Sequence, residues 1–240
     1  GWDAIEQESF VTVLRQNDED MLEEIGQVGG LGQGEQIYAV RFMGETGYVV
    51  TFRQVDPLYT VDLSDPTAPE VLGELKVEGY SAYLHPVGEG LILGVGQDAT
   101  EEGQTLGTQV SLFDVSDLAN PTRLHQYALG EGGSEVEYDH RAFLYWEPEQ
   151  LAVIPVSSWT WDEETQEETI FQGVLALEVD VQDGITKRGE IEHPQPGPDE
   201  WWGWGPRRSL VIGDALYTVS ETGIMASAMD DLSELAWITF

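Results

Sequence analysis

The sequence predicts an all-β protein, a β-propeller of four-stranded antiparallel blades, and three observations lead to this prediction. First, an apolar strand followed by an Asp-x-Ser-Asp turn, a proline and another strand occurs twice. The two turns begin at Asp62 and Asp114, which are 52 residues apart, close to the length of one propeller blade. Second, short runs of β-forming residues are divided throughout by Gly, Pro and Asp. Third, no long stretch shows the periodicity of an amphipathic helix.

In order from the N-terminus, we expect about four and a half blades in a single partial ring over residues 1–240. Residues 1–30 form a half blade, because the strands at 10–14 and 22–28 resemble only the last two strands of a blade. Four complete blades follow, at 35–78, 79–130, 138–193 and 206–240. Their expected strands are 36–42, 47–53, 57–63 and 71–77; 81–86, 91–95, 109–115 and 122–129; 140–145, 151–156, 171–179 and 185–191; 208–212, 215–219, 224–228 and 235–240.

Two recurring features support this division. The third strand of each blade ends at an acidic turn, complete in the first two full blades and reduced at 178–180 and 228–230. Three of the outer strands share a glycine followed by one residue and then an apolar residue. These glycines are Gly26, Gly73 and Gly189. A glycine inside a strand predicts a bend or a β-bulge, here near the rim of the propeller.

A ring that begins with half a blade leaves one strand edge without a neighbour. Three explanations stay open. An N-terminal half of a longer polypeptide supplies the other strands, a second chain supplies them, or the ring closes in another way.

The order of the segments resembles a family of secreted bacterial and archaeal proteins that carry a C-terminal beta-propeller domain. The resemblance lies in residues 37–42, 48–58, 83–86, 110–116, 138–144, 207–210 and 231–236. It implies a propeller fold, an extracellular setting, and that this chain corresponds to the C-terminal half of a longer family member. It implies no established activity.

Charge and composition exclude several classes of function. There are 45 acidic and 10 basic residues, a formal net charge of −35, which opposes binding to nucleic acid. No apolar run approaches the roughly 20 residues needed for membrane insertion, and no cysteine is present. An acidic, lysine-poor surface suits concentrated salt. We therefore expect a secreted or cell-surface protein of a saline environment, with an ordinary acidic secreted protein as the alternative.

The acidic turns have two interpretations. Clustered Asp oxygens suit Ca²⁺, the one cofactor that the sequence suggests. Each turn offers only about two carboxylates, however, whereas calcium takes six or more oxygen ligands. The favoured interpretation is structural, with Asp and Ser side chains bonded to nearby backbone N–H groups.

Polar residues near the starts of the expected inner strands are the main candidates for a site, because propellers commonly bind ligands near the central channel. These residues are Tyr83, Asp139, His140, Arg141, Arg207 and Arg208, with Arg41 and His85 slightly further along. The arginines could form a positively charged site at the opening of the channel, which would bind a carboxylate, sulfate or acidic sugar. Alternatively, they pair with neighbouring Asp and Glu and join blades together.

The histidines suggest two further kinds of site. A metal site would use Asp139 and His140, but no histidine spacing typical of metal ligands supports it. For catalysis, His140 or His85 is the candidate base and Tyr83 the candidate acid.

Tryptophans form the third group of candidates. Trp159 and Trp161 flank one insertion, and Trp201, Trp202 and Trp204 crowd the Pro- and Gly-rich stretch before the arginines. They either cap the propeller face or stack on a ligand bound at Arg207 and Arg208.

Three functions follow from these candidates. The first is a non-catalytic extracellular binding or scaffold module for a polymer, peptide or surface component, with a glycan or protein as its partner. The second is a hydrolase or lyase acting on an acidic glycan, with Arg141, Arg207 and Arg208 as a carboxylate clamp. The third is a structural surface-assembly protein. The sequence favours a protein without catalytic activity.

Overall fold

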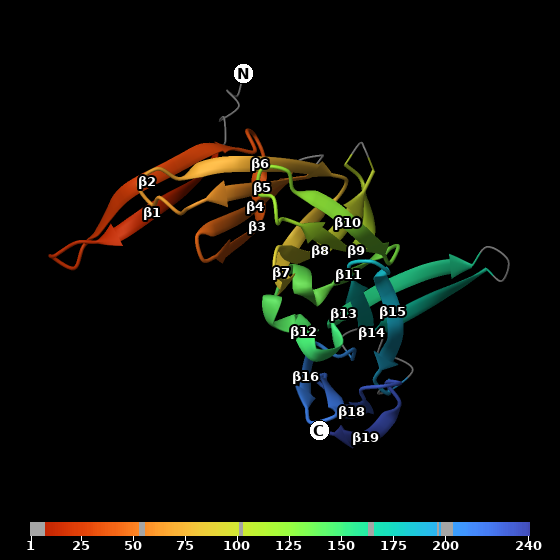
Figure 1. Cartoon of the computed structure of the whole chain (residues 1–240). Coiled ribbons are helices and arrows are strands. Elements are labelled where there is room, and N and C mark those ends of the chain that lie inside the picture. The colour runs from red at the N-terminus through yellow and green to blue at the C-terminus, as the bar shows by residue number, and fades with distance from the viewer. Residues whose placement is uncertain (1–7, 53–55, 101–102, 163–165, 196, 198–203) are drawn as a thin grey trace. The chain divides into compact units, whose positions relative to one another are not determined.

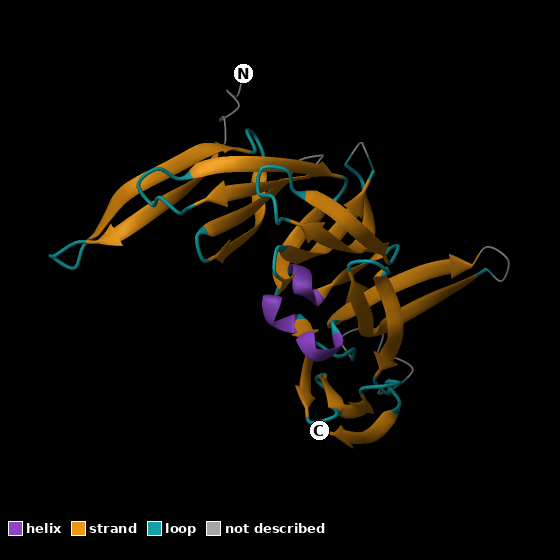
Figure 2. Ribbon diagram, in the orientation of Figure 1, coloured by secondary structure: helices purple, strands orange, loops and turns teal. Residues whose placement is uncertain are grey.

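The structure, a computed structural model, describes residues 8–52, 56–100, 103–162, 166–195, 197 and 204–240. These residues form strands joined by turns, together with short 3₁₀ segments, and the strands build the sheets seen in Figures 1 and 2. The predicted all-β class with four-stranded antiparallel sheets is confirmed. None of the helical segments in the described ranges is long and apolar enough to cross a bilayer.

In four of the described sheets, strands adjacent in sequence are hydrogen-bonded neighbours; in the sheet that contains β11 to β15, both β11 and β12 pair with β13. The N-terminal sheet contains β1 (Ser9–Gln16) and β2 (Leu22–Leu31). The next contains β3 (Gln36–Met43), β4 (Thr46–Phe52), β5 (Asp56–Asp62) and β6 (Glu70–Val77). The third contains β7 (Tyr80–Gly88), β8 (Leu91–Ala99), β9 (Thr105–Asp114) and β10 (Thr122–Ala128). The fourth contains β11 (Gly132–Ser134), β12 (Leu144–Trp146), β13 (Leu151–Asp162), β14 (Glu167–Asp180) and β15 (Gly184–Glu192). The last contains β16 (Arg208–Ile212), β17 (Ala215–Val219), β18 (Gly223–Ala228) and β19 (Glu234–Thr239).

The chain divides into two compact units. Unit 1 comprises Gly1–Gly94, Asp98–Thr105 and Phe113–Arg123, and unit 2 comprises Val95–Gln97, Leu106–Leu112 and Leu124–Phe240. The boundary passes through the β7–β10 sheet, so each unit contains parts of β8, β9 and β10.

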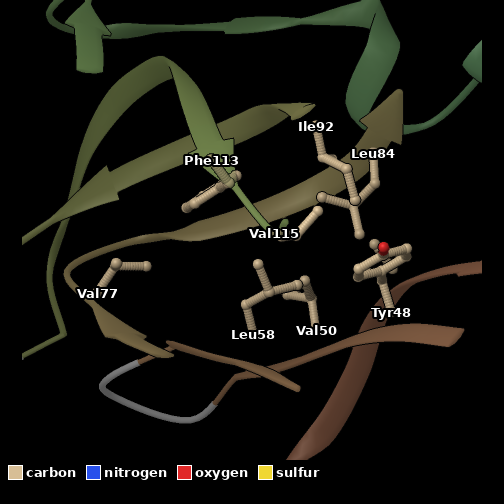
Figure 3. Packing of buried hydrophobic residues seen from close by; sticks show 9 residues of the cluster. Tyr48, Val50, Leu58, Val77, Leu84, Ile92, Phe113 and Val115 are labelled. Atoms are coloured by element: carbon tan, nitrogen blue, oxygen red, sulfur yellow. The ribbon is translucent and has the colours of Figure 1, made fainter. Parts of the chain in front are cut away.

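The core of unit 1 forms where the β3–β6 sheet packs face to face with residues of β7, β8 and β9. Tyr48, Val50 and Leu58 from the first of these sheets meet Leu84 and Phe113 from the second (Figure 3). The middle strands β4, β8 and β9 are buried almost throughout. Because such strands are covered on both faces, they read as nearly continuous apolar runs rather than as strict alternation.

The two-stranded sheet of β1 and β2 covers part of the opposite face of the β3–β6 sheet. Val11 and Leu31 pack there against Val49, Tyr59 and Val61. This contact buries the half blade against the first complete sheet and accounts for the apolar residues that alternate along β1.

That apolar face continues beyond the half blade. Among the described strands, β1 pairs only with β2. On β3, Val40 lies opposite Val49 and Phe42 lies opposite Gly47. The side chains of Val40 and Phe42 are 43% and 54% exposed. On this face, β1 and β2 leave these two side chains of β3 largely uncovered.

The outer-strand glycines lie against the acidic turn of the following sheet. A methyl group at Gly73 would lie 2.3 Å from the carbonyl oxygen of Leu118 and 2.8 Å from Cδ of Pro121. At Gly26 it would lie 2.4 Å from the carbonyl oxygen of Pro66. The repeated turn therefore docks on the outer strand of the preceding sheet, where only glycine leaves enough room.

The predicted bulges at these glycines are confirmed. The strand pairing shifts by one residue immediately before Gly26, Gly73 and Gly189, at Ile25, Leu72 and Arg188 respectively. The extra residue bends the outer strand, and the absent Cβ of the glycine admits the neighbouring turn.

The β10 strand differs at this contact. His125 follows Asp114 by 11 residues, as Gly73 follows Asp62, so it occupies the position of the glycine. Its Nε2 lies 2.8 Å from the carbonyl oxygen of Val181 in the next turn. A hydrogen bond there replaces the close steric contact made by glycine.

The innermost strand predicted at 140–145 is wrong. Two short strands, β11 and β12, both pair with β13, and they are separated by η1 (Glu135–Glu137) and η2 (His140–Ala142), with η3 (Glu147–Glu149) after β12. Ser134 and Glu137 form a reciprocal capping box around η1, and Asp139 caps η2. These local side-chain hydrogen bonds to the backbone stabilise turns at the expense of a continuous strand.

Candidate functional site

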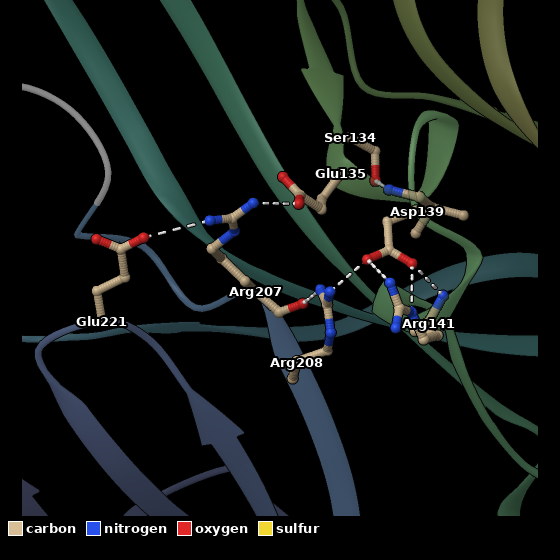
Figure 4. Close-up of polar contacts among 8 residues, drawn as sticks. Ser134, Glu135, Asp139, Arg141, Arg207, Arg208 and Glu221 are labelled. Atoms are coloured by element: carbon tan, nitrogen blue, oxygen red, sulfur yellow. Dashed lines mark hydrogen bonds and ion pairs between the residues drawn. The ribbon is translucent and has the colours of Figure 1, made fainter.

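Three of the predicted arginines converge in unit 2, and each meets a carboxylate (Figure 4). Arg207 lies just before β16 and places Nη2 2.6 Å from Oε1 of Glu135 and Nη1 3.3 Å from Oε1 of Glu221. Arg208, the first residue of β16, forms an ion pair with Asp139 and donates from Nη1 to the backbone oxygen of Arg207 at 2.6 Å.

Asp139 is the centre of this arrangement. Its Oδ1 accepts hydrogen bonds of 3.0 Å from both the backbone N–H and Nε of Arg141, while its Oδ2 is bonded by Arg208. The hydrogen bonds from the Arg141 side chain and backbone, together with nearby positive charge, lower the pKa of Asp139 from 3.8 to about 2. A carboxylate held by two guanidinium groups is a poor metal ligand, and no group of three or more His, Asp or Glu within the described ranges could hold a metal ion.

Replacing Asp139 by asparagine is expected to lower the melting temperature. The substitution removes the charge that both Arg141 and Arg208 face. Because the folded-state pKa lies below 3.8, the contribution of Asp139 is present above that pH and is lost as the pH falls through about 2. Thermal denaturation followed by circular dichroism at pH 7 checks this, with Asp18→Asn in an exposed turn as the control. Equal melting temperatures for the two variants would contradict the expectation.

The catalytic candidates lie on different elements. His140 is exposed at the first position of η2 rather than on an inner strand. Tyr83 and His85 lie on β7, and Tyr83 Oη is 2.9 Å from His85 Nδ1. Burial, followed by the charge of Arg41, lowers the pKa of His85 to about 4, and burial raises the pKa of Tyr83. Such a histidine is a weak base and such a tyrosine a weak acid near pH 7.

The acidic turns use their carboxylates internally. Asp62 accepts from the backbone N–H of Ser64 at 2.8 Å, and Asp114 accepts from both the N–H and the hydroxyl of Ser116, at 2.9 and 2.6 Å. These hydrogen bonds from serine lower the pKa of both carboxyl groups. The contacts are those of the structural interpretation.

A cavity of about 350 Å³ lies beside the arginines in unit 2, and we call it the Trp159 pocket. The side chain of Trp159 is 42% exposed and donates from Nε1 to Oε2 of Glu131 at 2.9 Å. The lining comes from the segment before and within η1, from β13 and β14, and from the residues before β16. It consists of Gly133, Ser134, Glu135, Tyr138, Pro155, Val156, Ser157, Trp159, Gln172, Gly205, Pro206 and Arg207.

The other predicted tryptophans divide into two groups. Trp204 is buried, as the capping interpretation expects. Trp201 and Trp202 lie outside the described residues, as does the side chain of Trp161.

Sequence reasoning placed Trp159 on a separate insertion and did not connect it with Arg207. The connection arises because Ser157 and Trp159 on β13 and Gln172 on β14 lie at the same end of one long hairpin as the 204–207 segment. A partial signal lies in the short distance along the sequence between Trp204 and Arg207.

Known proteins resemble this chain both in a family pattern and in sequence. The family model described as "Beta propeller domain" matches residues 1–232. An uncharacterized protein of Methanocaldococcus jannaschii is 45% identical over 134 residues, and one of Archaeoglobus fulgidus is 48% identical over 126 residues. These matches cover 56% and 52% of this chain but only 21% and 19% of the two relatives. The chain therefore matches about a fifth of the length of each relative.

Solved structures show the same fold at low identity. Citrobacter koseri AztD aligns with a TM-score of 0.51 and 14% identity, covering 96% of this chain and 56% of that chain. A structure of apo AztD from the same organism gives a TM-score of 0.50 at 14% identity, covering 96% of this chain and 57% of that chain. Similarity at this level concerns the fold alone.

Proposed function

We propose that this chain, which belongs to the beta propeller domain family, acts as a non-catalytic binding module. Its ligand occupies the Trp159 pocket. The pocket is the observation that supports this proposal. It is concave, it is lined mainly by apolar groups, and it carries a small number of polar side chains, a combination typical of ligand sites.

The ligand that fits this lining best is a sugar residue of a glycan. The exposed ring of Trp159 offers a face for stacking on the C–H groups of a sugar, and Tyr138 adds a second aromatic side chain at the rim. Gln172 and Ser157 provide hydrogen-bonding groups for sugar hydroxyls. With a net charge of −35, the protein favours a neutral glycan over an acidic one at this place.

The arginine geometry gives less support to the alternative of a hydrolase or lyase on an acidic glycan. Arg141, Arg207 and Arg208 are each bonded to a carboxylate of the protein. A substrate carboxylate would have to displace Asp139 or Glu135 from these guanidinium groups. We therefore place these arginines in the wall and support of the pocket rather than in a substrate clamp.

The setting that we propose is the cell surface or the extracellular space in concentrated salt. The excess of acidic over basic residues supports this, because a densely carboxylated surface remains hydrated and repels other copies when salt screens most charges.

Replacing Trp159 by alanine is expected to reduce glycan affinity at least tenfold, since a buried aromatic side chain commonly contributes about 2 kcal/mol or more to a binding interface. A glycan array identifies a neutral oligosaccharide, and isothermal titration calorimetry then compares the variants. Trp159→Phe keeps an aromatic ring and should retain most of the affinity. Phe10→Ala removes another exposed aromatic side chain, on β1 in unit 1, and is the matched control.

Two results would overturn the proposal. One is an array on which the wild-type protein binds no neutral glycan. The other is an equal loss of affinity in Trp159→Ala and Phe10→Ala. Binding to a peptide library but to no glycan would move the proposal from sugar recognition to peptide recognition at the same pocket, provided that Trp159→Ala abolishes it.

A further inference from the structure

We propose that Arg41, Tyr83 and His85 form a second binding site, which takes a carboxylate group of a small ligand. The three residues lie on β3 and β7, the first strands of two successive sheets, within unit 1. This site is separate from the Trp159 pocket, whose lining belongs entirely to unit 2.

Arg41 differs from most of the positive charges in this protein. Nine of the ten lysines and arginines are described, and seven of them form ion pairs with Asp or Glu. Arg41 and Arg123 form none with any described acidic residue. With 45 acidic residues in the chain, a guanidinium left without a carboxylate stands out.

The Nε atom of Arg41 is buried and has no hydrogen-bond partner among the described residues. A buried donor that makes no hydrogen bond destabilises the folded protein, and more so when the group is charged. Native proteins leave few such donors, and a bound group that accepts the hydrogen bond is one common explanation. An acceptor from a ligand would satisfy this donor.

Tyr83 and His85 lie within reach of the same charge. Strands β3 and β7 are in contact. The charge of Arg41 adds to the burial that lowers the pKa of His85, and it opposes the burial that raises the pKa of Tyr83. Tyr83 Oη and His85 Nδ1 are 2.9 Å apart, and their rings are tilted at a centroid distance of 5.9 Å. The cluster thus combines one fixed positive charge with a hydroxyl and an imidazole that is neutral at pH 7.

The half blade does not explain the missing partner of Arg41. Arg41 lies opposite Tyr48, which belongs to the core cluster shared by the β3–β6 sheet and β7–β9. Val40 and Phe42, the neighbours of Arg41 along β3, point to the other face of the sheet, which β1 and β2 partly cover. Two more strands beside β1 would therefore cover the face opposite Arg41.

A carboxylate suits this charge and geometry. A guanidinium group donates two parallel hydrogen bonds to a carboxylate, and the charge of the monoanion balances the single positive charge of the cluster. A phosphate dianion would leave an excess negative charge inside a protein whose net charge is already −35. The Tyr83 hydroxyl has one proton, which it can donate either to Nδ1 of His85 or to a carboxylate oxygen.

Aromatic residues lie together near the beginning of the same strands. Tyr38 on β3 and Tyr80 on β7 have ring centroids 4.4 Å apart, and Phe52 lies 4.8 Å from Tyr80. Tyr80 precedes Tyr83 by three residues, about 10 Å along a strand. The ligand class that we propose is a carboxylate attached to a ring, such as a sugar acid.

D-Galacturonate and D-galactose, which differ in a carboxylate, are the probes for calorimetric titration of the 240-residue chain. Galacturonate should bind saturably and at least tenfold more tightly than galactose at this site. Arg41→Gln should abolish the preference for galacturonate, whereas Arg15→Gln, which removes an exposed arginine on β1, should keep it within twofold. Inorganic phosphate should compete weakly, and tighter binding of phosphate than of galacturonate would overturn the assignment to a carboxylate.

A readout at His85 separates this site from the Trp159 pocket. Bound carboxylate places negative charge beside the imidazole, so the pKa of His85, measured by NMR, should rise from about 4 when galacturonate is added. The rise should persist in Trp159→Ala and disappear in Arg41→Gln. An unchanged His85 pKa in the wild-type protein at saturating galacturonate would overturn the proposal, even if the glycan binding proposed for the other pocket holds.

Folding of the variants is checked by thermal melting. Arg41→Gln removes a buried donor without a partner, so its melting temperature should equal or exceed that of the wild-type protein. If it unfolds, Arg41→Lys retains the charge but cannot form the two parallel hydrogen bonds, and it should still bind galacturonate severalfold more weakly. Equal affinity in Arg41→Lys and the wild-type protein would contradict a guanidinium–carboxylate contact.

Discussion

Replacing Gly73 by alanine is expected to destabilise the protein by about 3 kcal/mol, because the added methyl group has no room. It would lie 2.3 Å from the carbonyl oxygen of Leu118 and 2.8 Å from Cδ of Pro121. Both neighbours belong to the acidic turn of the next sheet, and that turn is fixed further by the hydroxyl of Thr60, which donates to the Leu118 oxygen. To relieve the clash, the turn must move away from the outer strand and lose this hydrogen bond.

Urea unfolding followed by tryptophan fluorescence measures the effect as a change in the free energy of unfolding. Gly133→Ala is the matched control, because Gly133 also lies in a strand but a methyl group there would meet only a side-chain oxygen of Glu137 at 3.9 Å. The control should change stability by less than about 1 kcal/mol. If Gly73→Ala proved as mild as Gly133→Ala, the turn could shift freely, and the docking contact would not determine blade packing.

The free energy of unfolding is expected to fall by about 3 kcal/mol between pH 7 and pH 4 because of His193 alone. This side chain is 3% exposed, with Nδ1 2.8 Å from Ser220 Oγ and Nε2 2.7 Å from Thr218 Oγ1. Burial lowers its pKa from 6.5 to about 4. The unfolded chain therefore binds a proton below pH 6.5 that the folded protein does not bind until about pH 4, and at about 1.4 kcal/mol per pKa unit stability falls over that window.

Unfolding in urea at a series of pH values tests this expectation. His193→Gln loses part of its hydrogen bonding at every pH, so it should be less stable than the wild-type protein at pH 7 and should show a shallower decline towards pH 4. Part of the decline should remain, because burial also lowers the pKa of His85 to about 4. Parallel profiles for His193→Gln and the wild-type protein would show that His193 is readily protonated in the folded state.

The sequence predicted the repeating parts of the fold well, because they depend on local signals. The strand expected at 208–212 coincides with β16, and the bulges at the outer-strand glycines occur where expected. The failure at 140–145 arose from a signal that was present but not used. Ser134 and Glu137 have the spacing of a capping box, which begins a helical turn rather than a strand.

The candidate site could be predicted only in part, because it depends on contacts between distant residues. The sequence identified Arg207 as a candidate and predicted that it either binds a ligand or pairs with an acidic residue. It could not identify Glu135, which is 72 residues away, as the partner of Arg207. It also could not place Trp159 beside Arg207, since this contact depends on the packing of the β13–β14 hairpin against the segment before β16.

The docking of an acidic turn on the outer strand of the preceding sheet gives the protein an order of assembly during synthesis. Pro69 follows Gly26 by 43 residues, and Pro121 follows Gly73 by 48. While the chain emerges from the ribosome, an outer strand therefore stays uncovered until most of the next sheet has been made. Each sheet is completed by its successor, so a pause in translation within one blade would leave the previous blade exposed to wrong pairing.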